Sequence, residues 1–225
     1  KWNRRHFRDM VSYADKLIGK IDQTLQELGI RDNTLLLFTC DNGTYKGITS
    51  PFRGQNVRGG KGSTPNAGTH VPLIASWPGT IEPGSVSDDL IDFSDLFPTV
   101  AAAAGGQLPQ HRKIDGRSFL PQLKGKPGNP RDWVFCWYQR NGKRDSSVKR
   151  FARNQAYKLY HDGRMYHIPS DELEKRQLTP DQIDTRRRQI RTQLKSVIDT
   201  IYGEERDFPY HPDGTPRQKS KPTTP

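Results

Sequence analysis

Two adjacent side chains with metal-binding oxygens, Asp41 and Asn42, directly follow an apolar segment at 34–39 that predicts a short strand. In open α/β sheets, ligands bind at the carboxyl ends of the strands. A carboxylate and an amide carbonyl are oxygen ligands of the kind that Ca²⁺ or Mg²⁺ prefers. The alternative interpretation is an Asx turn closed by Gly43, which needs no ligand. The residues alone offer a candidate metal site and leave both interpretations open.

A second candidate is the glycine-rich segment 58–63, which reads RGGKGS and carries Lys61. Glycines let the backbone approach an anion closely, and the lysine ammonium supplies a point charge. The spacing excludes a P-loop, because a count from Gly54 requires lysine at position 60, where the chain has Gly60. The alternative is a flexible surface loop. His70 closes the same glycine-rich stretch and is the histidine whose position most favours a role in a site.

Several classes of catalytic or metal site are missing from the sequence. It contains no Gly-x-Ser-x-Gly elbow of a serine hydrolase and no histidine pair at i and i+4 of a zinc helix. The two cysteines cannot form a four-cysteine zinc site. No nucleophile is therefore evident in this chain.

The elements that position these residues follow from the hydrophobic pattern. Apolar residues recur at steps of three and four from Phe7 to Leu28 and predict one long helix. Strands are predicted at 34–39 and 71–76, apolar on both faces as in a parallel sheet, with a long loop at 40–70 between them. A second helix is predicted at 94–104. This order of elements indicates an α/β fold.

Beyond a linker at 124–130, the pattern changes to short aromatic strands. Between the last two strands, Asp162-Gly163 predicts a type I′ hairpin turn, so the strands form a small antiparallel sheet. The four strands are predicted at 133–138, 147–152, 157–161 and 164–168.

A capping box that begins at Thr179, with Pro180 next to it, predicts the start of a helix that ends at Gly203. The composition after this helix is rich in proline and lysine and predicts disorder. We therefore predict a first domain at 1–125, a small subdomain of antiparallel sheet and helix at 130–205, and a disordered tail at 206–225.

The net charge of +11 lies entirely in residues 111–225, whereas residues 1–110 carry equal numbers of acidic and basic side chains. Such an excess indicates an anionic partner: a sulfated or phosphorylated substrate, nucleic acid or a membrane surface. The aromatic platforms and recognition-helix pattern of nucleic-acid modules are missing, and no apolar stretch approaches the roughly 18 residues of a membrane span. We therefore expect neither a nucleic acid nor a membrane as partner.

The order of these segments resembles the C-terminal part of a type I sulfatase, in the alkaline phosphatase superfamily. The resemblance runs from about residue 13 to about residue 178, and each fragment is short, but their order and spacing are specific. The fragments are DNT at 32–34, DNG at 41–43, GGK at 59–61, AGTHVPLI at 67–74, WPG at 77–79, DLFPT at 95–99, DGRS at 115–118 and YKL at 157–159.

The resemblance implies roles for the candidate residues. Asp41 and Asn42 look like two of the family's Ca²⁺ ligands, and Lys61 looks like the catalytic lysine that holds the sulfate and its bridging oxygen. His70 stands where many members have an arginine and is expected to bind substrate, whereas Tyr45 stands where many have a histidine. The family nucleophile is a formylglycine made within a Cys/Ser-x-Pro/Ala-x-Arg signature, which this sequence lacks. The resemblance therefore places the nucleophile outside this chain.

The implied fold is a partial sulfatase sandwich followed by a small antiparallel sheet with a helix. The implied function is hydrolysis of a sulfated small molecule or glycan in the periplasm or outside the cell, with this chain inactive by itself. One alternative is a fragment that binds anionic glycans or acts as a scaffold. Another is a related phosphodiesterase or phosphonate hydrolase, although those enzymes favour Asp-His pairs at the metal where this chain has Asp41 and Asn42.

Overall fold

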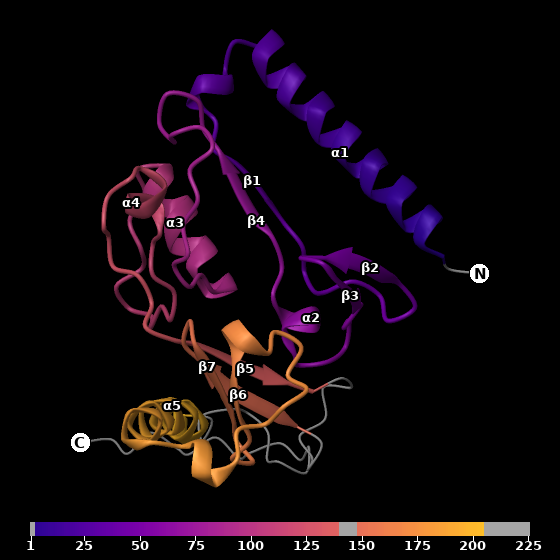
Figure 1. Ribbon diagram of the computed structural model, residues 1–225. Coiled ribbons are helices and arrows are strands. Elements are labelled where there is room, and N and C mark those ends of the chain that lie inside the picture. The colour runs from indigo at the N-terminus through magenta and orange to yellow at the C-terminus, as the bar shows by residue number, and fades with distance from the viewer. Residues whose placement is uncertain (1–2, 140–147, 205–225) are drawn as a thin grey trace, which may run out of the picture. The chain divides into compact units, whose positions relative to one another are not determined.

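The computed structural model describes residues 3–139 and 148–204, and the chain forms two compact units, 1–131 and 132–225. Figure 1 shows the helices and strands of both units. The predicted tail at 206–225 lies outside the described residues.

The first unit mixes helices with short strands, which confirms the predicted α/β class. Its helices are α1 (Arg4–Glu27), α2 (Asn66–Thr69), α3 (Leu96–Ala103) and α4 (Leu120–Leu123), and two 3₁₀ turns lie at Arg31–Asn33 and Phe93–Asp95. Its strands are β1 (Leu36–Thr39), β2 (Thr49–Phe52), β3 (Gln55–Arg58) and β4 (Leu73–Ser76).

Helix α1 confirms the helix predicted from the apolar repeat. The side chain of Asn3 caps its first turn by accepting a hydrogen bond from the amide of His6 at 3.0 Å. Gly29 follows the helix with a positive φ of 66°, a conformation that glycine adopts without a steric penalty. None of the side chains of α1 is buried, and its apolar stripe stays about half exposed in this chain, as at Met10 (52%) and Ile21 (51%).

The predicted parallel arrangement of the two apolar strands is wrong. β1 and β4 pair antiparallel, from Leu36 opposite Ser76 to Thr39 opposite Leu73. The connection between them contains no crossover helix of the length that a parallel neighbour needs, and the chain instead turns back beside β1. The strands are also only partly buried, with Ile74 59% exposed.

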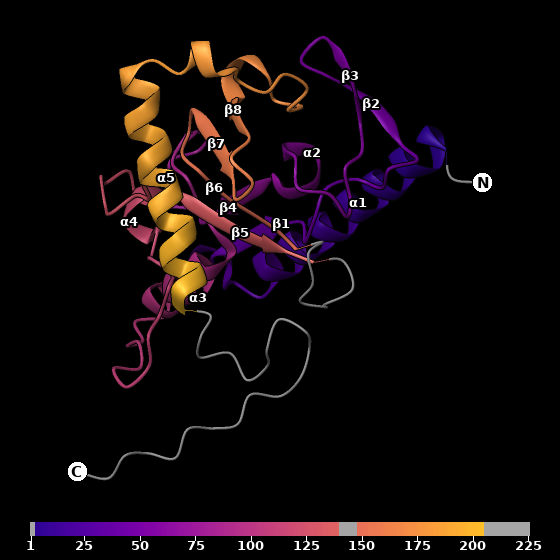
Figure 2. The ribbon, with the colours of Figure 1, turned by 90° about the horizontal axis from the view of Figure 1, so that it is seen from below.

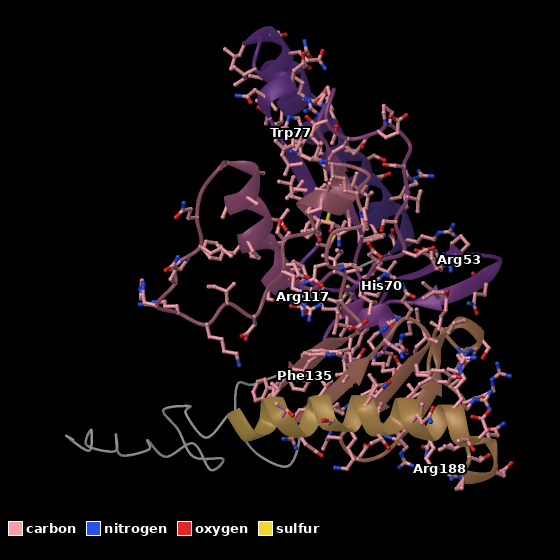
Figure 3. The ribbon with its side chains drawn as sticks, turned by 90° about the vertical axis from the view of Figure 1, so that its left-hand side faces the viewer. Arg53, His70, Trp77, Arg117, Phe135 and Arg188 are labelled. Atoms are coloured by element: carbon pink, nitrogen blue, oxygen red, sulfur yellow. The ribbon has the colours of Figure 1, made fainter. Side chains whose placement is uncertain are left out.

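The prediction of a structureless loop at 40–70 is also wrong. Strands β2 and β3 form an antiparallel hairpin within it, and Figure 3 shows Arg53 at its end. Arg53 and Gly54 both have positive φ values, 48° and 78°, as a two-residue type I′ turn requires. Arginine is an uncommon residue for the first of these positions, and for that reason the turn was not predicted.

The helix predicted at 94–104 is confirmed, although its start is a separate 3₁₀ turn. Asp92 caps this turn through a capping box with Asp95, and α3 continues from Leu96. Pro98 lies in the first turn of α3, where its missing N–H removes no helical hydrogen bond. The chain leaves α3 through Gly105, which has a φ of 71°.

The second unit confirms the predicted four-stranded antiparallel sheet and its helix. Figure 2 shows helix α5 (Thr185–Glu204) lying across the sheet, and its residues Leu194 and Ile198 pack against the buried side chains of one face. The strands follow the order of the sequence: β5 (Val134–Tyr138), β6 (Lys149–Arg153), β7 (Tyr157–Tyr160) and β8 (Met165–His167). The core under α5 consists of Ala152, Leu159, Met165, Leu194 and Ile198.

Two local details of the second unit differ from the prediction. The β7–β8 turn has positive φ at Gly163 (91°) but not at Asp162, so it is not a type I′ turn. Gly163 instead donates to the carbonyl of Tyr160 at 2.9 Å, as in a longer hairpin loop that ends on glycine. The capping box at Thr179 starts only a single 3₁₀ turn, Pro180–Gln182, and α5 begins five residues after the proline.

Candidate functional site

The three predicted site segments of the first unit meet through backbone hydrogen bonds. The amide of Gly43 donates to the carbonyl of Gly68 at 3.0 Å, and the amide of Lys61 donates to the carbonyl of Thr44 at 2.9 Å. The amide of Gly60 donates to the carbonyl of Ala67 at 3.1 Å. Hydrogen bonds therefore join the backbone after Asp41-Asn42, the backbone of Lys61 and helix α2, although Gly43 and Gly68 lie 25 positions apart in the sequence.

Glycine is required where these segments meet, because the backbones lie too close for a side chain. A Cβ atom on Gly43 would lie 1.9 Å from the carbonyl oxygen of Ala67. A Cβ atom on Gly68 would lie 2.2 Å from the carbonyl oxygen of Ser63. Gly59 and Gly60 are equally restricted, with backbone atoms 2.3 Å and 2.5 Å from their added Cβ positions. We call Gly43, Gly59, Gly60 and Gly68 the glycine contact.

Asp41 and Asn42 lie at the end of β1, as predicted for a candidate metal site. The Asp41 side chain is exposed, and the amide of Asn42 donates a hydrogen bond to its carboxylate. This bond joins two side chains, whereas an Asx turn is closed by a backbone N–H group, so the bond favours neither interpretation of the pair. Within 3–139 and 148–204, no group of three or more His, Cys, Asp or Glu side chains is placed to hold a metal ion.

The side chain of Lys61 is exposed and makes no ion pair with the part of the chain that the structure describes. Its backbone is fixed by the bond to Thr44, whereas the ammonium is available to an anion. His70 follows α2, donates its amide to Asn66 at 2.9 Å and is exposed (Figure 3). The structure thus brings the backbones of three predicted segments together and leaves the side chains of Asp41, Lys61 and His70 accessible.

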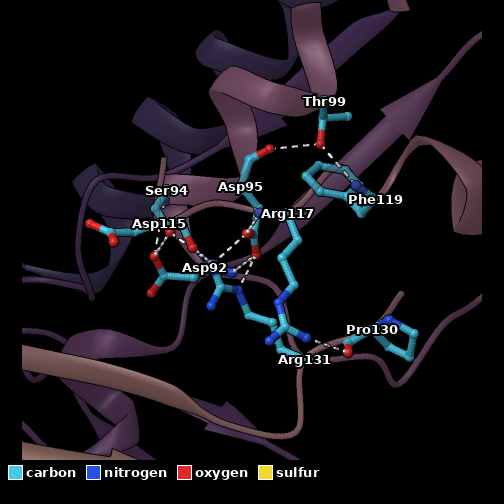
Figure 4. Close-up of polar contacts among 9 residues, drawn as sticks. All are labelled: Asp92, Ser94, Asp95, Thr99, Asp115, Arg117, Phe119, Pro130 and Arg131. Atoms are coloured by element: carbon cyan, nitrogen blue, oxygen red, sulfur yellow. Dashed lines mark hydrogen bonds and ion pairs between the residues drawn. The ribbon is translucent and has the colours of Figure 1, made fainter. Parts of the chain in front are cut away.

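A buried ion pair links three segments of the first unit, at 92–99, 115–119 and 130–131 (Figure 4). The guanidinium of Arg131 binds the Asp95 carboxylate through two hydrogen bonds of 2.7 and 2.6 Å, and Asp95 is only 1% exposed. This hydrogen-bonded carboxylate raises the pKa of Arg131. Asp95 also accepts from the amides of Asp92 and Arg117, at 2.8 and 2.6 Å. All its lone-pair directions are used internally, so this cluster is structural and not a binding site.

Two family models match the chain. The sulfatase model matches residues 3–106, and the model described as N-sulphoglucosamine sulphohydrolase, C-terminal, matches residues 64–201, which is more than half of the chain. The chain belongs to the sulfatase family. The resemblance inferred from the sequence motifs is thereby confirmed.

Curated sulfatases share clear sequence identity with the chain. Steryl-sulfatase from Rattus norvegicus is 39% identical over 125 residues, which are 53% of this chain and 22% of that protein. N-acetylgalactosamine-6-sulfatase from Homo sapiens is 41% identical over 123 residues, which are 53% of this chain and 23% of that protein. This sulfatase chain therefore spans less than a quarter of the length of these relatives.

Solved sulfatase structures share the fold. The PsFucS1 sulfatase from Pseudoalteromonas sp. superposes with a TM-score of 0.70 at 24% identity, covering 90% of this chain and 43% of that one. A sulfatase solved with its substrate D-glucosamine-2-N,6-O-disulfate gives a TM-score of 0.68 at 23% identity, covering 86% of this chain and 40% of that one. The roles of Asp41, Asn42, Lys61 and His70 in this sulfatase chain stay predictions.

Sequence reasoning missed the structural partners of these residues. The glycines at 43, 59, 60 and 68 stand out in the sequence, but the sequence does not show that they pack against one another. The close backbone contact at Gly68 became evident only from its hydrogen bond with Gly43, 25 positions earlier. The β2–β3 hairpin that leads into the Lys61 loop was missed as well, because its turn residue is Arg53.

Proposed function

We propose that the protein containing this chain hydrolyses sulfate esters, and that the chain supplies the anion-binding lysine and two of the metal ligands of the active site. The observation that supports this most is the hydrogen bond from the Lys61 amide to the carbonyl of Thr44, two residues after Asn42. This bond connects the loop of Lys61 to the segment that follows Asp41 and Asn42, and the glycine contact keeps the two backbones close together.

Lys61 would act on the charge of the ester. A sulfate monoester carries delocalised negative charge, and more charge develops on the bridging oxygen as the S–O bond breaks. An ammonium held beside that oxygen stabilises the transition state more than the ground state. His70 would contact the substrate from the end of α2, where its ring is exposed.

Asp41 and Asn42 fit a calcium ion in chemistry but not in number. Both offer hard oxygen ligands, whereas Ca²⁺ takes about 6–8 of them, so the ion would need further oxygen ligands besides this pair. When bound, the ion would withdraw charge from the sulfate oxygens. The formylglycine nucleophile would also lie outside this chain, and we infer that the 225-residue chain alone does not turn over sulfate esters.

Substitution of Lys61 tests the catalytic proposal in the full protein. Lys61→Ala is expected to lower kcat for an aryl sulfate by roughly 10²–10³, as the loss of one preorganised donor does. Lys61→Arg should restore only part of the rate, because a planar guanidinium does not replace a compact ammonium. Lys46→Ala is the matched control, since Lys46 is an exposed lysine of the same loop region. Near-normal turnover by Lys61→Ala would remove the lysine from the site.

The calcium proposal has a readout that does not depend on activity. Addition of Ca²⁺ should raise the melting temperature of the full protein, because an ion that binds only the folded state stabilises it. Asp41→Ala should reduce this shift strongly, whereas Asp32→Ala, which changes an exposed carboxylate outside the pair, should leave it intact. An equal calcium shift in the Asp41 variant would favour the Asx-turn interpretation.

We further propose a sulfated carbohydrate as the substrate class. The supporting observations are the charge of +11 in residues 111–225 and the titles of two fold neighbours, one solved with a glucosamine disulfate and one with a neocarrahexaose. A periplasmic or extracellular location is proposed from the family alone. None of the helices among residues 3–139 and 148–204 is long and apolar enough to cross a membrane. Turnover of a sulfated monosaccharide faster than of an aryl phosphate diester would separate this function from a phosphodiesterase.

A further inference from the structure

Arg58 is the last residue of strand β3 and lies three positions before Lys61. Its side chain is exposed, and its Nε–H group donates a hydrogen bond of 2.7 Å to the backbone carbonyl of Lys46. This is the only hydrogen bond or ion pair of the Arg58 side chain within residues 3–139 and 148–204. The two terminal nitrogens of the guanidinium therefore retain four N–H donors for a ligand.

One short segment of backbone holds both Arg58 and Lys61. The carbonyl of Lys46 accepts from the guanidinium of Arg58, and the carbonyl of Thr44 accepts from the amide of Lys61 at 2.9 Å. Two residues of extended chain span at most about 7 Å, so the two carbonyls lie close together. The guanidinium is thereby fixed near the backbone of Lys61, within reach of one substrate molecule.

The sequence around Arg58 offers it no carboxylate. Residues 42–81 contain no Asp or Glu, whereas they contain the cations Lys46, Arg53, Arg58 and Lys61. A guanidinium that is anchored through Nε presents its two terminal nitrogens together, and their geometry matches two oxygens of one carboxylate or sulfate group. Lys61 is assigned to the ester that reacts, so the anchored guanidinium suits a second oxyanion on the same molecule.

We propose that Arg58 is a specificity-determining residue that binds a second anionic group of the substrate, beside the ester that is hydrolysed. This group is an oxyanion, either a carboxylate or a further sulfate. The inference rests on the proposed function, because the role of Lys61 defines where the reacting ester lies. It adds that the preferred substrate carries two negative groups close together.

Steady-state kinetics of the full protein with three chromogenic esters tests the proposal. Nitrophenyl sulfate carries one anionic group, the same ester with an ortho carboxylate carries two, and nitrocatechol disulfate carries a second sulfate. Arg58→Gln is expected to lower the kcat/KM of a doubly charged ester, relative to that of nitrophenyl sulfate, about tenfold, because it removes charged hydrogen bonds. Arg58→Lys should retain part of the preference, since it keeps the charge without the fork.

The ester that loses most in Arg58→Gln identifies the second group as a carboxylate or a sulfate. Arg53→Gln is the matched control, because it removes the same charge from the far end of the same hairpin, and it should leave the relative kcat/KM unchanged (Figure 3).

The inference and the proposed function fail in different ways. If the three esters were hydrolysed but their relative kcat/KM stayed at the wild-type value in Arg58→Gln, Arg58 would not bind a second anion. An equal change in Arg58→Gln and Arg53→Gln would overturn the inference as well, because a general charge effect would then explain it. If the wild-type protein hydrolysed none of the three esters, the proposed function would fail, and this inference with it.

Discussion

The ammonium of Lys158 lies 2.7 Å from a carboxylate oxygen of Glu174 inside the second unit, where the two side chains are 0% and 2% exposed. The other carboxylate oxygen accepts a hydrogen bond of 2.6 Å from the hydroxyl of Tyr160. The ammonium also lies 3.8 Å from the ring centroid of Phe151, a favourable cation–π distance. Glu174 has a positive φ of 54°, which is uncommon for a residue other than glycine.

Removal of Lys158 alone should be strongly destabilising. Lys158→Met leaves the Glu174 carboxylate buried without its cation, and such a change costs about 3–5 kcal/mol. The double variant Lys158→Met with Glu174→Gln should be clearly more stable than the single variant, because no uncompensated charge remains. Denaturant unfolding of the three proteins measures this. A double variant that is less stable than Lys158→Met would contradict the prediction, because the unpaired carboxylate of Glu174 would then not be the cause of the loss.

The same lysine predicts a stability change at alkaline pH. Burial lowers the pKa of Lys158 to about 8, from its ordinary value of 10.5. Between these values the unfolded chain holds a proton that the folded protein has released, so the contribution of Lys158 to the free energy of unfolding rises with pH from about 8 to about 10.5. The difference between wild type and the double variant isolates the contribution of the pair, because all titrating groups except Lys158 and Glu174 are common to both. Parallel pH curves from pH 7 to 10 would contradict it.

Arg131 should contribute as much to the stability of the first unit as Lys158 does to that of the second. Arg131→Met leaves the carboxylate of Asp95 buried with only backbone amides and is expected to cost about 3–5 kcal/mol. Arg131→Lys should recover only part of this, since an ammonium cannot make the two parallel bonds to Asp95. Thermal unfolding checks both variants.

The control for Arg131 is its neighbour in the cluster, Arg117. The side chain of Arg117 makes a hydrogen bond of 3.2 Å to the carbonyl of Pro130, and its contact with Asp95 comes from the backbone, which a substitution preserves. Arg117→Met should therefore cost about 1 kcal/mol. A similar loss in the Arg131 and Arg117 variants would mean that the bidentate pair is not what stabilises this cluster.

The sequence predicted elements whose signal is local. The apolar repeat of α1 and the alternating aromatic strands of the second unit follow from the 3.6-residue and two-residue periods of helix and strand, and both were confirmed. The direction of β4 relative to β1 was predicted wrongly, because apolar runs carry no information about which neighbour a strand pairs with.

The candidate site was predictable in its residues but not in its assembly. Asp41, Lys61 and His70 were identified by type and position, whereas the bonds from Gly43 to Gly68 and from Lys61 to Thr44 join segments far apart in the chain.

The glycine contact gives the most direct test of how the site is held. Gly43→Ala would place a Cβ atom 1.9 Å from the carbonyl oxygen of Ala67, so one backbone must move and the bond from Gly43 to Gly68 must break. Overpacking of this kind costs about 1–3 kcal/mol. Because a displacement of about 1 Å at a catalytic group can cost about 10² in rate, we expect turnover by the full protein to fall by that order.

Gly19→Ala is the matched control for this substitution. Gly19 lies in the middle of α1, and apart from its own helix turns none of the described residues lies within 4 Å of an added Cβ. Alanine in a helix interior is more stable than glycine by about 0.5–1 kcal/mol. The same glycine-to-alanine change should therefore stabilise the protein at position 19, whereas at position 43 it should lower both stability and turnover. Sulfate ester kinetics and thermal unfolding of the two variants measure both effects. If Gly43→Ala kept normal turnover, the loops of Asp41 and Lys61 would not depend on this backbone contact, and their joint positioning would have to come from elsewhere in the protein.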